Sequence, residues 1–568
     1  MTDSKSARAD LVDALRSIVG AHEVFTDESC TRRFTTGYRY GEGAVLAVVR
    51  PRNLVELWRT LKECVKAGVI IIMQAANTGL TGGSTPYGDY DRDVVLINSL
   101  RMKGIHLIVG GRQVVCMPGA TLYELEDALK PHGREPHSVI GSSCIGASVF
   151  GGICNNSGGA LVQRGPAYTE LALYARIDEE GELQLVNHLG IRLGSDPEEM
   201  LRRVEAGGFD NADILHDAVR RASDHDYSAH VRKVGEATPA RFNADPSRLF
   251  EASGSAGKVA LMAVRLDTFP KEADTATFYI GTNSTNDLGR IRREILQNFQ
   301  TLPIAGEYIH RDAFDLAAKY GKDMVIAIER LGTARLPSLF ALKARVDEWA
   351  RKLPLLPRRM SDHILQMSGR LFPDHLPRRM WDFRDGYEHH LILKIGADGI
   401  AEARAYLEAR YPNGDGDFFE CTKAEAEKAF LHRFAVAGAA VRYRAVNSRT
   451  VEDIIALDVA LRRNDSEWFE VLPTAIEKHL VKTLYYGHFF CHVFHQDYIV
   501  AKGADPVALE HEMLEILDRR GAEYPAEHNV GHLYKAKPAL ESHYRALDPG
   551  NSFNPGIGQT ARGANWQP

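Results

Sequence analysis

Residues 75–86 of the chain read Ala75-Ala76-Asn77-Thr78-Gly79-Leu80-Thr81-Gly82-Gly83-Ser84-Thr85-Pro86, and they follow directly on Val69–Met73, an apolar run that predicts a buried strand. Glycines let a backbone approach a ligand closely, and successive N–H groups together with Thr and Ser hydroxyls bind anions. The stretch therefore predicts a loop that holds a pyrophosphate; the alternative is a surface loop without a ligand. The chain has neither a G-x-G-x-x-G after a strand nor a Walker A motif, which disfavours Rossmann and P-loop folds.

The segments around this loop alternate between strand and helix patterns. Capping-box patterns at Asn53-x-x-Glu56 and Thr121-x-x-Glu124 each precede apolar positions at helical spacing. Runs rich in β-branched and apolar residues separate these helices. We therefore expect an α+β fold class, with strands at 44–49, 69–73, 93–99, 105–109 and 113–117.

Composition limits the class of protein. A chain of 568 residues is too long for one compact core, so about two to four units are expected. It is 44% hydrophobic and 25% charged, which disfavours disorder, and its net charge of −6 disfavours a general nucleic-acid binder. The first twenty residues predict an amphipathic helix without the apolar core of a secretory signal. The seven cysteines form no C-x-x-C pair, so we expect a reduced cytosolic protein without a zinc ribbon or disulfide framework.

Two basic segments stand out on this acidic chain. Residues 311–386 carry a net charge of +5, and residues 426–449 carry +4. Prolines, arginines and apolar residues alternate in the first segment, which predicts irregular or short-helical structure. No apolar run approaches the ~18 residues that span a bilayer. With Trp381 as an interfacial aromatic, these segments predict peripheral contact with an anionic membrane surface; the alternative is an ordinary solvated face.

Two further segments share the character of the first loop. Residues 141–159 are equally rich in small residues, and Asp548–Gly556 reads Asp-Pro-Gly-Asn-Ser-Phe-Asn-Pro-Gly. Alone, residues 141–159 would suit a tight packing bend as well as a ligand site. Together, the three segments resemble the FAD-binding domain of the vanillyl-alcohol-oxidase, or PCMH-type, superfamily. More narrowly, the chain is similar, nearly end to end, to the family of bacterial quinone-dependent D-lactate dehydrogenases, with matching stretches at 73–81, 134–148 and 524–535.

The resemblance implies three parts of the chain. A two-subdomain PCMH-type FAD-binding domain would be formed by residues 1–268 and 521–568. An inserted α+β cap domain that holds the substrate would be formed by 269–310, 387–425 and 450–520. A basic membrane-binding region would be formed by 311–386 and 426–449.

The resemblance also implies a function: respiratory oxidation of D-lactate to pyruvate by hydride transfer to FAD, with the electrons passed to a membrane quinone. The protein would lie peripherally on the cytoplasmic face of the inner membrane. Alternatives are another D-2-hydroxy acid such as D-2-hydroxyglutarate, or oxygen or a carrier protein as acceptor. Other classes are a membrane-surface protein that keeps a flavin for structure only, and a metal hydrolase. The FAD contacts carried over are Ala75, Ala76, Asn77, Thr78, Gly79, Gly83, Ser84, Gly141, Ser148, Gly158 and Leu261.

Oxidation of a 2-hydroxy acid needs a base for the hydroxyl proton, and histidine suits that role. Histidines gather in the stretch 487–496 and in the pair Glu527-His528. On a regular strand His488 and His492 would share one face and His495 would lie on the other, unless a bulge or turn intervenes. In related flavoprotein 2-hydroxy-acid dehydrogenases, two histidines seven apart and a Glu-His pair line the substrate site.

By that resemblance His528 is the expected base, and His488, His495 and Glu527 line the site. The relatives can hold a divalent metal there, and three N/O ligands would suit Zn²⁺. This chain lacks the Gly-Asp-Gly-Asn between the histidines, and Asn529 replaces a glycine after the pair. A metal and plain hydrogen bonding by the histidines therefore both stay open.

The substrate carboxylate needs a cation. Arg433 and Arg442 flank the apolar run 434–441 and are the candidates, of which Arg433 is preferred. For Arg442 a place on the solvated basic face is an equal alternative, and Arg444 is expected at the surface.

Overall fold

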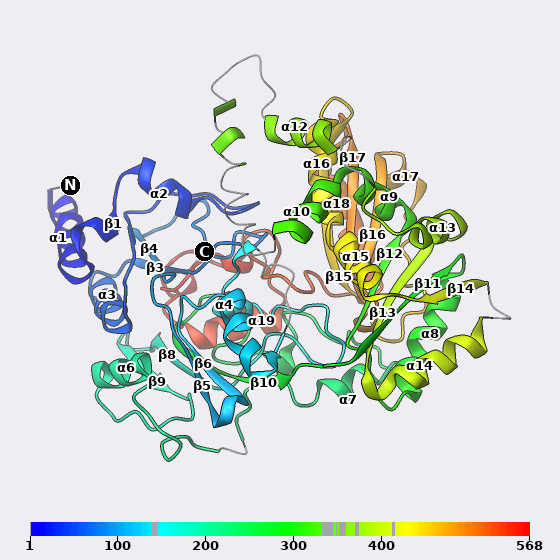
Figure 1. Cartoon of the computed structure of the whole chain (residues 1–568). Helices are drawn as coiled ribbons and strands as arrows, with labels where there is room; N and C mark the ends of the chain where they lie inside the picture. The colour runs from blue at the N-terminus through cyan, green and yellow to red at the C-terminus, as the bar shows by residue number, and fades with distance from the viewer. Residues whose placement is uncertain are drawn as a thin grey trace.

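The computed structural model describes residues 2–138, 145–216, 219–331, 343, 345–347, 349–350, 359–369, 374–411 and 415–567. Three sheets organise this part of the chain (Figure 1). The two sheets of the amino-terminal half lie on one side of the molecule, and a seven-stranded sheet lies on the other. The carboxyl-terminal residues, red in Figure 1, return to the side of the first two sheets.

The first sheet has the order β1 (Val24–Phe25), β2 (Ala47–Val49), β4 (Val94–Asn98), β3 (Ile70–Gln74), and its last three strands are parallel. Helix α3 (Leu54–Lys66) joins β2 to β3, the kind of crossover that parallel strands require. The strands predicted on either side of the Gly-rich loop are confirmed. Helices α1 (Thr2–Val19), the predicted amino-terminal helix, and α2 (Glu28–Thr35) complete this part.

The two predicted helix caps differ in detail. The Thr121 side chain and the Glu124 carboxylate form a complete capping box at the start of α4 (Leu122–Leu129). Asn53 accepts the Glu56 N–H at the start of α3, as predicted. The Glu56 carboxylate, however, accepts the Arg52 N–H at 2.9 Å, so this box is incomplete.

The second sheet is antiparallel and is built around the long strand β10 (Ala260–Pro270). Strands β5 (Ile105–Ile108) and β6 (Gln113–Cys116) form the predicted hairpin around Gly110-Gly111. β10 pairs with β6, β7 and β8. The remaining elements of this part are β7 (Arg134–Pro136), β8 (Ala172–Ile177), β9 (Leu183–Asn187), α5 (Val149–Cys154), α6 (Pro197–Ala206) and α7 (Tyr227–Val231).

The third sheet is antiparallel, with the order β14-β11-β13-β12-β16-β17-β15. In that order, its strands span Gly416–Glu420, Thr275–Thr282, His389–Gly396, Ala305–His310, Leu480–His488, Val493–Ala501 and Val451–Ala460. Its helices are α8 (Thr285–Asn298), α9 (Arg311–Tyr320), α10 (Lys322–Leu331), α12 (Met360–Ser368), α13 (Arg378–Gly386), α14 (Ala397–Arg410), α15 (Lys423–Phe434), α16 (Val436–Val446), α17 (Thr474–Glu477) and α18 (Pro506–Arg519).

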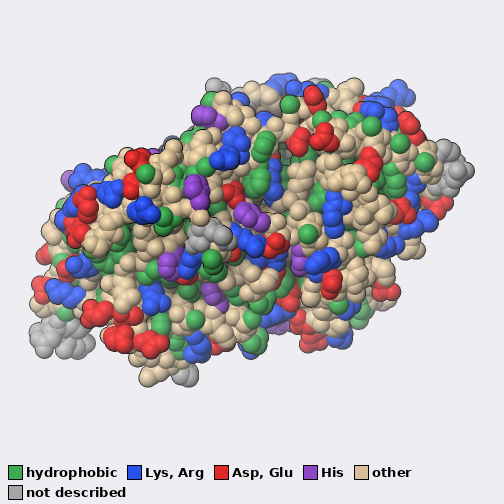
Figure 2. Space-filling model, turned by 90° about the horizontal axis from the view of Figure 1, so that it is seen from below, with side chains coloured by type: hydrophobic (Ala, Val, Ile, Leu, Met, Phe, Trp, Pro, Cys, Tyr) green, Lys and Arg blue, Asp and Glu red, His purple; other side chains and the backbone are tan. Residues whose placement is uncertain are grey.

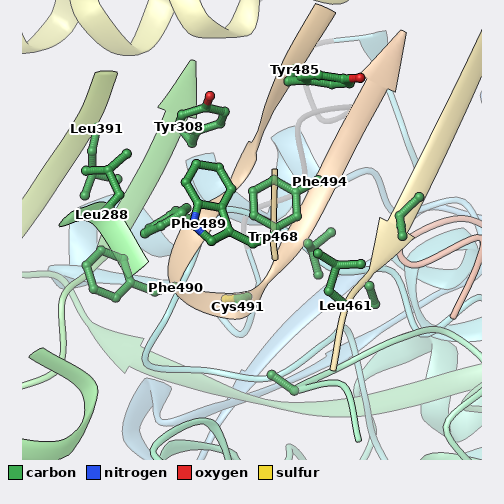
Figure 3. Packing of buried hydrophobic residues seen from close by; sticks show 14 of the residues in the cluster. Leu288, Tyr308, Leu391, Leu461, Trp468, Tyr485, Phe489, Phe490, Cys491 and Phe494 are labelled. Atoms are coloured by element: carbon green, nitrogen blue, oxygen red, sulfur yellow. The ribbon is translucent and has the colours of Figure 1, made fainter. Parts of the chain in front are cut away.

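The two faces of this sheet pack against different partners. On one face, Tyr308, Trp468, Phe489 and Phe494 form an aromatic core, which Figure 3 shows at close range. On the other face, Ile309, Leu484 and Ile499 pack with α9 and α16. Because side chains alternate along a strand, Glu307, His488 and Tyr486 share this second face with Ile309. The candidate catalytic groups therefore lie on the face covered by α9, α15 and α16.

The basic segments form these covering helices. Helices α9 to α13 are inserted between β12 and β13, and α15 and α16 precede β15. Residues 311–331 fold into two ten-residue helices, which is the short-helical alternative of the prediction, and Ala313, Phe314 and Ala317 bury an apolar face of α9. Much of 332–358 lies outside the described residues. Within the described part of the chain, no helix is both long and apolar enough to cross a bilayer.

The residues after α18 rejoin the amino-terminal sheets. The Ile71 N–H donates to Ser552 O at 2.9 Å, and the Asn554 N–H donates to Ile71 O at 2.9 Å. Helix α19 (Pro538–Leu547) precedes this contact. The division of the chain at 268/269 would cut β10 two residues before its end, and it stays a prediction.

Candidate active site

A cavity of about 910 Å³ lies between the Gly-rich loops and the third sheet. Every described residue of the expected flavin and catalytic sets lines it, whereas Gly141 lies outside the described residues. The lining members of the flavin set are Ala75, Ala76, Asn77, Thr78, Gly79, Gly83, Ser84, Ser148, Gly158 and Leu261. The lining members of the catalytic set are Arg433, His488, His495, Glu527 and His528.

The first Gly-rich loop is held open at the end of β3. Gln74 Nε2 donates to Ser84 O at 2.8 Å and fixes both ends of the loop. Asn77 has a left-handed backbone (φ 53°), and its Nδ2 donates to Thr36 O at 2.9 Å. Within the described residues, no N–H of residues 76–80 has a protein acceptor. A Cβ placed on Gly79 would meet no atom within 4 Å, so these donors face open space in the cavity.

The second Gly-rich segment approaches the catalytic residues. Ser148 caps α5 by accepting the Gly151 N–H at 2.9 Å. Gly158 lies against Glu527 so closely that a Cβ there would collide with the Glu527 carboxylate. Leu261, on β10, closes the cavity from the second sheet. Only glycine at 158 therefore lets the flavin loop and Glu527 pack together.

The two histidines of the β16–β17 hairpin face one another. A 3-10 turn, Phe489–Cys491, separates the strands, and His492 follows it with a left-handed backbone (φ 56°). This turn reverses the alternation, so His488 and His495 share one face, with ring centroids 5.3 Å apart. His492 points away and hydrogen-bonds to Arg462 O at 2.9 Å. The stretch is therefore not one regular strand, and the predicted exception for an intervening turn applies.

Two carboxylates enclose His488. Its Nδ1 lies 2.6 Å from Glu307 Oε1, and its Nε2 lies 3.2 Å from Glu527 Oε2. Burial alone would lower the pKa of His488, but the two carboxylates outweigh burial and raise that pKa to about 9. His488 is therefore a cation at neutral pH in this geometry, suited to donate a hydrogen bond rather than to accept a proton.

Asp458 joins the other histidines of the site. Its carboxylate lies 3.3 Å from His495 Nδ1 and 3.8 Å from His528 Nε2, and it accepts the Glu527 N–H at 2.6 Å. Burial raises the pKa of the Asp458 carboxyl, but His528 and His495 outweigh it and the pKa stays below its usual range. Asp458 thus orients His495, His528 and the backbone of Glu527 together.

Glu527 is fixed by a buried arginine. Arg241 Nη2 lies 2.7 Å from Glu527 Oε1 and also hydrogen-bonds to Gly159 O, while Nη1 donates to Leu161 O at 3.0 Å. Burial alone would raise the pKa of Glu527, but His488 and Arg241 outweigh it and hold that pKa well below its usual range. The pair ties the second Gly-rich segment to the catalytic residues.

The arginines of the basic segments have different places: Arg433 and Arg444 line the cavity, and Arg442 is buried among the helices. Arg433 Nε lies 2.7 Å from Glu307 Oε2, and its buried Nη2 has no hydrogen-bond partner among the described residues. Arg442 is a candidate that the structure moves out of the site: it is buried against Asp323 and Asp362, because two carboxylates hold it inside the helix cluster. Arg444 is half-buried, lines the cavity and pairs with Asp453 at 2.9 Å.

Sequence reasoning missed Glu307, Asp458 and Arg241. Glu307 is the one carboxylate in the buried strand β12, and Asp458 interrupts the apolar second half of β15; a carboxylate in such a stretch was a usable signal. Arg241 lies in an irregular segment, and nothing in its neighbouring residues points to Glu527, 286 positions away. The residues that sequence reasoning missed are those that orient the histidines and Glu527.

Comparison with known proteins covers the whole chain. A family model described as "FAD binding domain" matches residues 45–185, and one described as "D-lactate dehydrogenase, membrane binding" matches residues 277–566. The quinone-dependent D-lactate dehydrogenase of Haemophilus influenzae is 60% identical over 98% of this chain and 99% of the relative. The enzyme of the same name from Escherichia coli K12 is 58% identical over 100% and 98%. The Corynebacterium glutamicum enzyme is 46% identical over 98% of each chain.

Solved structures with a similar fold support the fold assignment. A substrate-bound p-cresol methylhydroxylase superposes with a TM-score of 0.59 at 11% identity, covering 97% of both chains. A 4-ethylphenol oxidase from Gulosibacter chungangensis superposes with a TM-score of 0.57 at 13% identity over the same coverage. The predicted α+β fold of PCMH type is therefore confirmed.

Proposed function

Because this chain belongs to the family of quinone-dependent D-lactate dehydrogenases, we propose that the side chains gathered at its cavity divide the oxidation of D-lactate among them. The protein is an FAD-dependent oxidoreductase that converts D-lactate to pyruvate and passes the electrons to a quinone. One observation carries the assignment of residues: the flavin loops and the histidine–carboxylate cluster line the same cavity.

FAD suits the first loop and the segment after it. The unused N–H groups of residues 76–80 and the space beside Gly79 match a pyrophosphate. Ser148 and Gly158 lie further along the same cavity, and Leu261 contributes an apolar wall. FAD bound there would supply the acceptor for the hydride from C2 of the substrate. The protein contributes the binding, the orientation and the proton chemistry.

His528 is the proposed base for the substrate hydroxyl. It is the most exposed histidine of the cluster, and Asp458 lies close enough to stabilise the positive charge that proton uptake creates. His495, held by Asp458, would donate a hydrogen bond to a substrate oxygen. His488, whose two ring nitrogens face Glu307 and Glu527, would add positive charge beside the substrate. Arg433, whose Nη2 is free, would bind the carboxylate. Glu527 contacts both His488 and Gly158, so it fixes the position of His488 relative to the second Gly-rich segment.

A divalent cation is the second candidate for this cluster. Ligand atoms of His488, His495 and Glu527 all lie within 4.8 Å of one another, so the donor set suits a metal with an open position. Glu307 and Asp458 stand behind the two histidines, as carboxylates do in metal sites. These three residues would hold the metal, which would supply a Lewis acid for a substrate oxygen, and His488 would then be a neutral ligand. The metal content of purified protein, before and after chelation, decides between the two arrangements.

The protein associates peripherally with the membrane through its carboxyl-terminal family region. We propose that α12 and α16 contact an anionic bilayer on its cytoplasmic side. Met367 on α12 is 71% exposed, and Val441 on α16 is 41% exposed, beside the basic segments. On the face opposite α12, acidic and basic side chains are interspersed (Figure 2). Trp381, the expected interfacial aromatic, is half-buried beside Phe314 and stays a prediction. Trp349, 58% exposed, is added to the proposal.

Anaerobic flavin bleaching near ~450 nm tests the function directly. D-lactate, L-lactate and D-2-hydroxyglutarate are added separately, and a quinone analogue follows. We expect rapid bleaching by D-lactate alone and recovery on addition of the quinone. Bleaching by D-2-hydroxyglutarate instead would show that this acid is the substrate. Recovery only with oxygen would show that oxygen is the acceptor.

A further inference from the structure

One end of the cavity is unused by the proposed oxidation of lactate. We call it the outer lobe and define it by Arg39, Phe434, Ala437, Ile454, Tyr486, Asp497, Pro506 and Val507, all of which line the cavity. It starts beside the histidines and ends at the surface. Asp497 and Tyr486 are buried, Phe434 is half-buried, and Val507 is 59% exposed.

The register of the third sheet places the lobe relative to the catalytic residues. Asp458, His495 and Tyr486 stand in one row across β15, β17 and β16. Asp497 stands in the next row, opposite Ala456, and Ile454 stands in the row after that. Successive rows on one face are roughly 7 Å apart, so the lobe extends roughly 14 Å from the histidine row toward α16 and α18.

The inner part of the lobe is polar. Tyr486 Oη donates to Asp497 Oδ2 at 2.7 Å, and Tyr486 is the only described hydrogen-bond partner of the Asp497 side chain. Arg39 reaches this region from the first part of the chain, where Nη2 donates to Ile454 O at 3.4 Å. Among the described residues, Arg39 has no carboxylate within ion-pair distance. Its remaining N–H groups are therefore available to a carbonyl oxygen of a ligand.

The outer part of the lobe combines apolar residues with Arg444, Asp453 and Glu510 of the same elements, and it leads to the membrane-binding helices. Phe434 and Ala437 belong to the α15–α16 corner, and Pro506 and Val507 begin α18. Helix α12, with its exposed Met367, packs against α16 (Figure 1). Because Ala437 of α16 lines the lobe, the lobe lies next to the helices proposed to meet the bilayer. A small anion such as D-lactate gains nothing from such walls, whereas an apolar tail does.

We propose that the outer lobe binds the quinone, with its carbonyl headgroup beside Arg39 and Tyr486 and its apolar tail leaving between α16 and α18. The inference rests on the proposed function, because it locates the acceptor of the electrons. The quinone gains two electrons and two protons, and each carbonyl oxygen forms an O–H bond. FAD reduced by the hydride would supply the two electrons and one proton, and the proton that His528 took from the substrate hydroxyl would balance the second.

A photoreactive short-chain azidoquinone tests the location without relying on activity. The holoenzyme is irradiated with this probe, and the labelled peptides are mapped by mass spectrometry. We expect labels in residues 434–446 and 506–510, and competition by an unlabelled short-chain quinone. Labels confined to other peptides would overturn the proposal.

Two variants add a kinetic readout. Arg39→Leu removes the donor, and Val507→Trp narrows the mouth; each is expected to raise the KM for a short-chain quinone about tenfold, more than any change in the KM for D-lactate. Val471→Trp, at a position 82% exposed and away from the cavity, is the matched control. The proposal fails if Val507→Trp raises the KM for the quinone no more than Val471→Trp does. It also fails if Arg39→Leu changes only the KM for D-lactate. Absence of flavin bleaching by D-lactate in the unmodified enzyme would instead refute the proposed function, and the labelling would still locate the quinone.

Discussion

Replacing Arg241 by methionine is expected to destabilise the site strongly, because it leaves Glu527 buried without its cation. Arg241 is 1% exposed and Glu527 is 7% exposed, so solvent screens the pair weakly. Removing one partner of a buried ion pair costs about 3–5 kcal/mol. The lost hydrogen bonds to Gly159 O and Leu161 O add to this cost. The total is a large share of the ~5–15 kcal/mol by which folded domains are stable.

The assay compares urea midpoints and flavin content across four proteins. Arg232→Met is the matched control, since Arg232 hydrogen-bonds the carbonyls of Leu296, Phe299 and Gln300 but has no described carboxylate partner. We expect Arg241→Met to lower the midpoint more than Arg232→Met and to release FAD. The double variant Arg241→Met/Glu527→Gln should recover part of the lost stability, because the side chains at positions 241 and 527 are then both uncharged. A double variant no better than Arg241→Met, or an Arg241→Met effect no larger than that of Arg232→Met, would refute the charge argument.

Three further expectations concern the base, the pH and the membrane. His528→Ala should slow flavin reduction by D-lactate ~100-fold or more while FAD stays bound, and near-normal reduction would remove it as the base. The pKa of His488 is about 9 in the folded chain and ordinarily 6.5, so its contribution to stability is complete below pH 6.5 and is lost as the pH rises through 9. Glu307→Gln should therefore destabilise the chain most below pH 6.5, and a difference that grows toward pH 9 in urea titrations would contradict this. Reversing the exposed charges with Arg359→Glu and Arg378→Glu should weaken binding to anionic vesicles by about 1 kcal/mol or more for each residue; unchanged co-sedimentation would refute the membrane proposal.

Local patterns in the sequence predicted the local structure well. The apolar run before the Gly-rich loop, the Thr121 cap and the hairpin around Gly110 each depend on neighbouring residues, and the structure has all three. The first basic segment was predicted to be irregular or short-helical, and its described residues include the short helices α9, α10, α12 and α13. Helix α9 buries its apolar face against the third sheet, and α10 packs against α9 and α15.

The site depended on contacts that the sequence does not display. The Phe489–Cys491 turn contains no glycine, proline or asparagine, so the reversal that brings His495 beside His488 had no local signal. Arg442 was a candidate for the substrate carboxylate because of its place in the chain, yet Asp323 neutralises it from another helix. Which charges neutralise one another is decided by tertiary packing, and a single sequence gives only the list of charged residues.

The return of the carboxyl-terminal residues to the first sheet has a consequence for biosynthesis. Asn554 Nδ2 donates to Gly83 O in the pyrophosphate loop at 2.9 Å, across 471 positions of sequence. The Ile71 backbone likewise completes its hydrogen bonds only with Ser552 and Asn554. A ribosome therefore makes the flavin loop long before it makes the residues that brace it. Nascent chains should be unable to retain FAD until residues 552–554 have been made and can reach the first sheet.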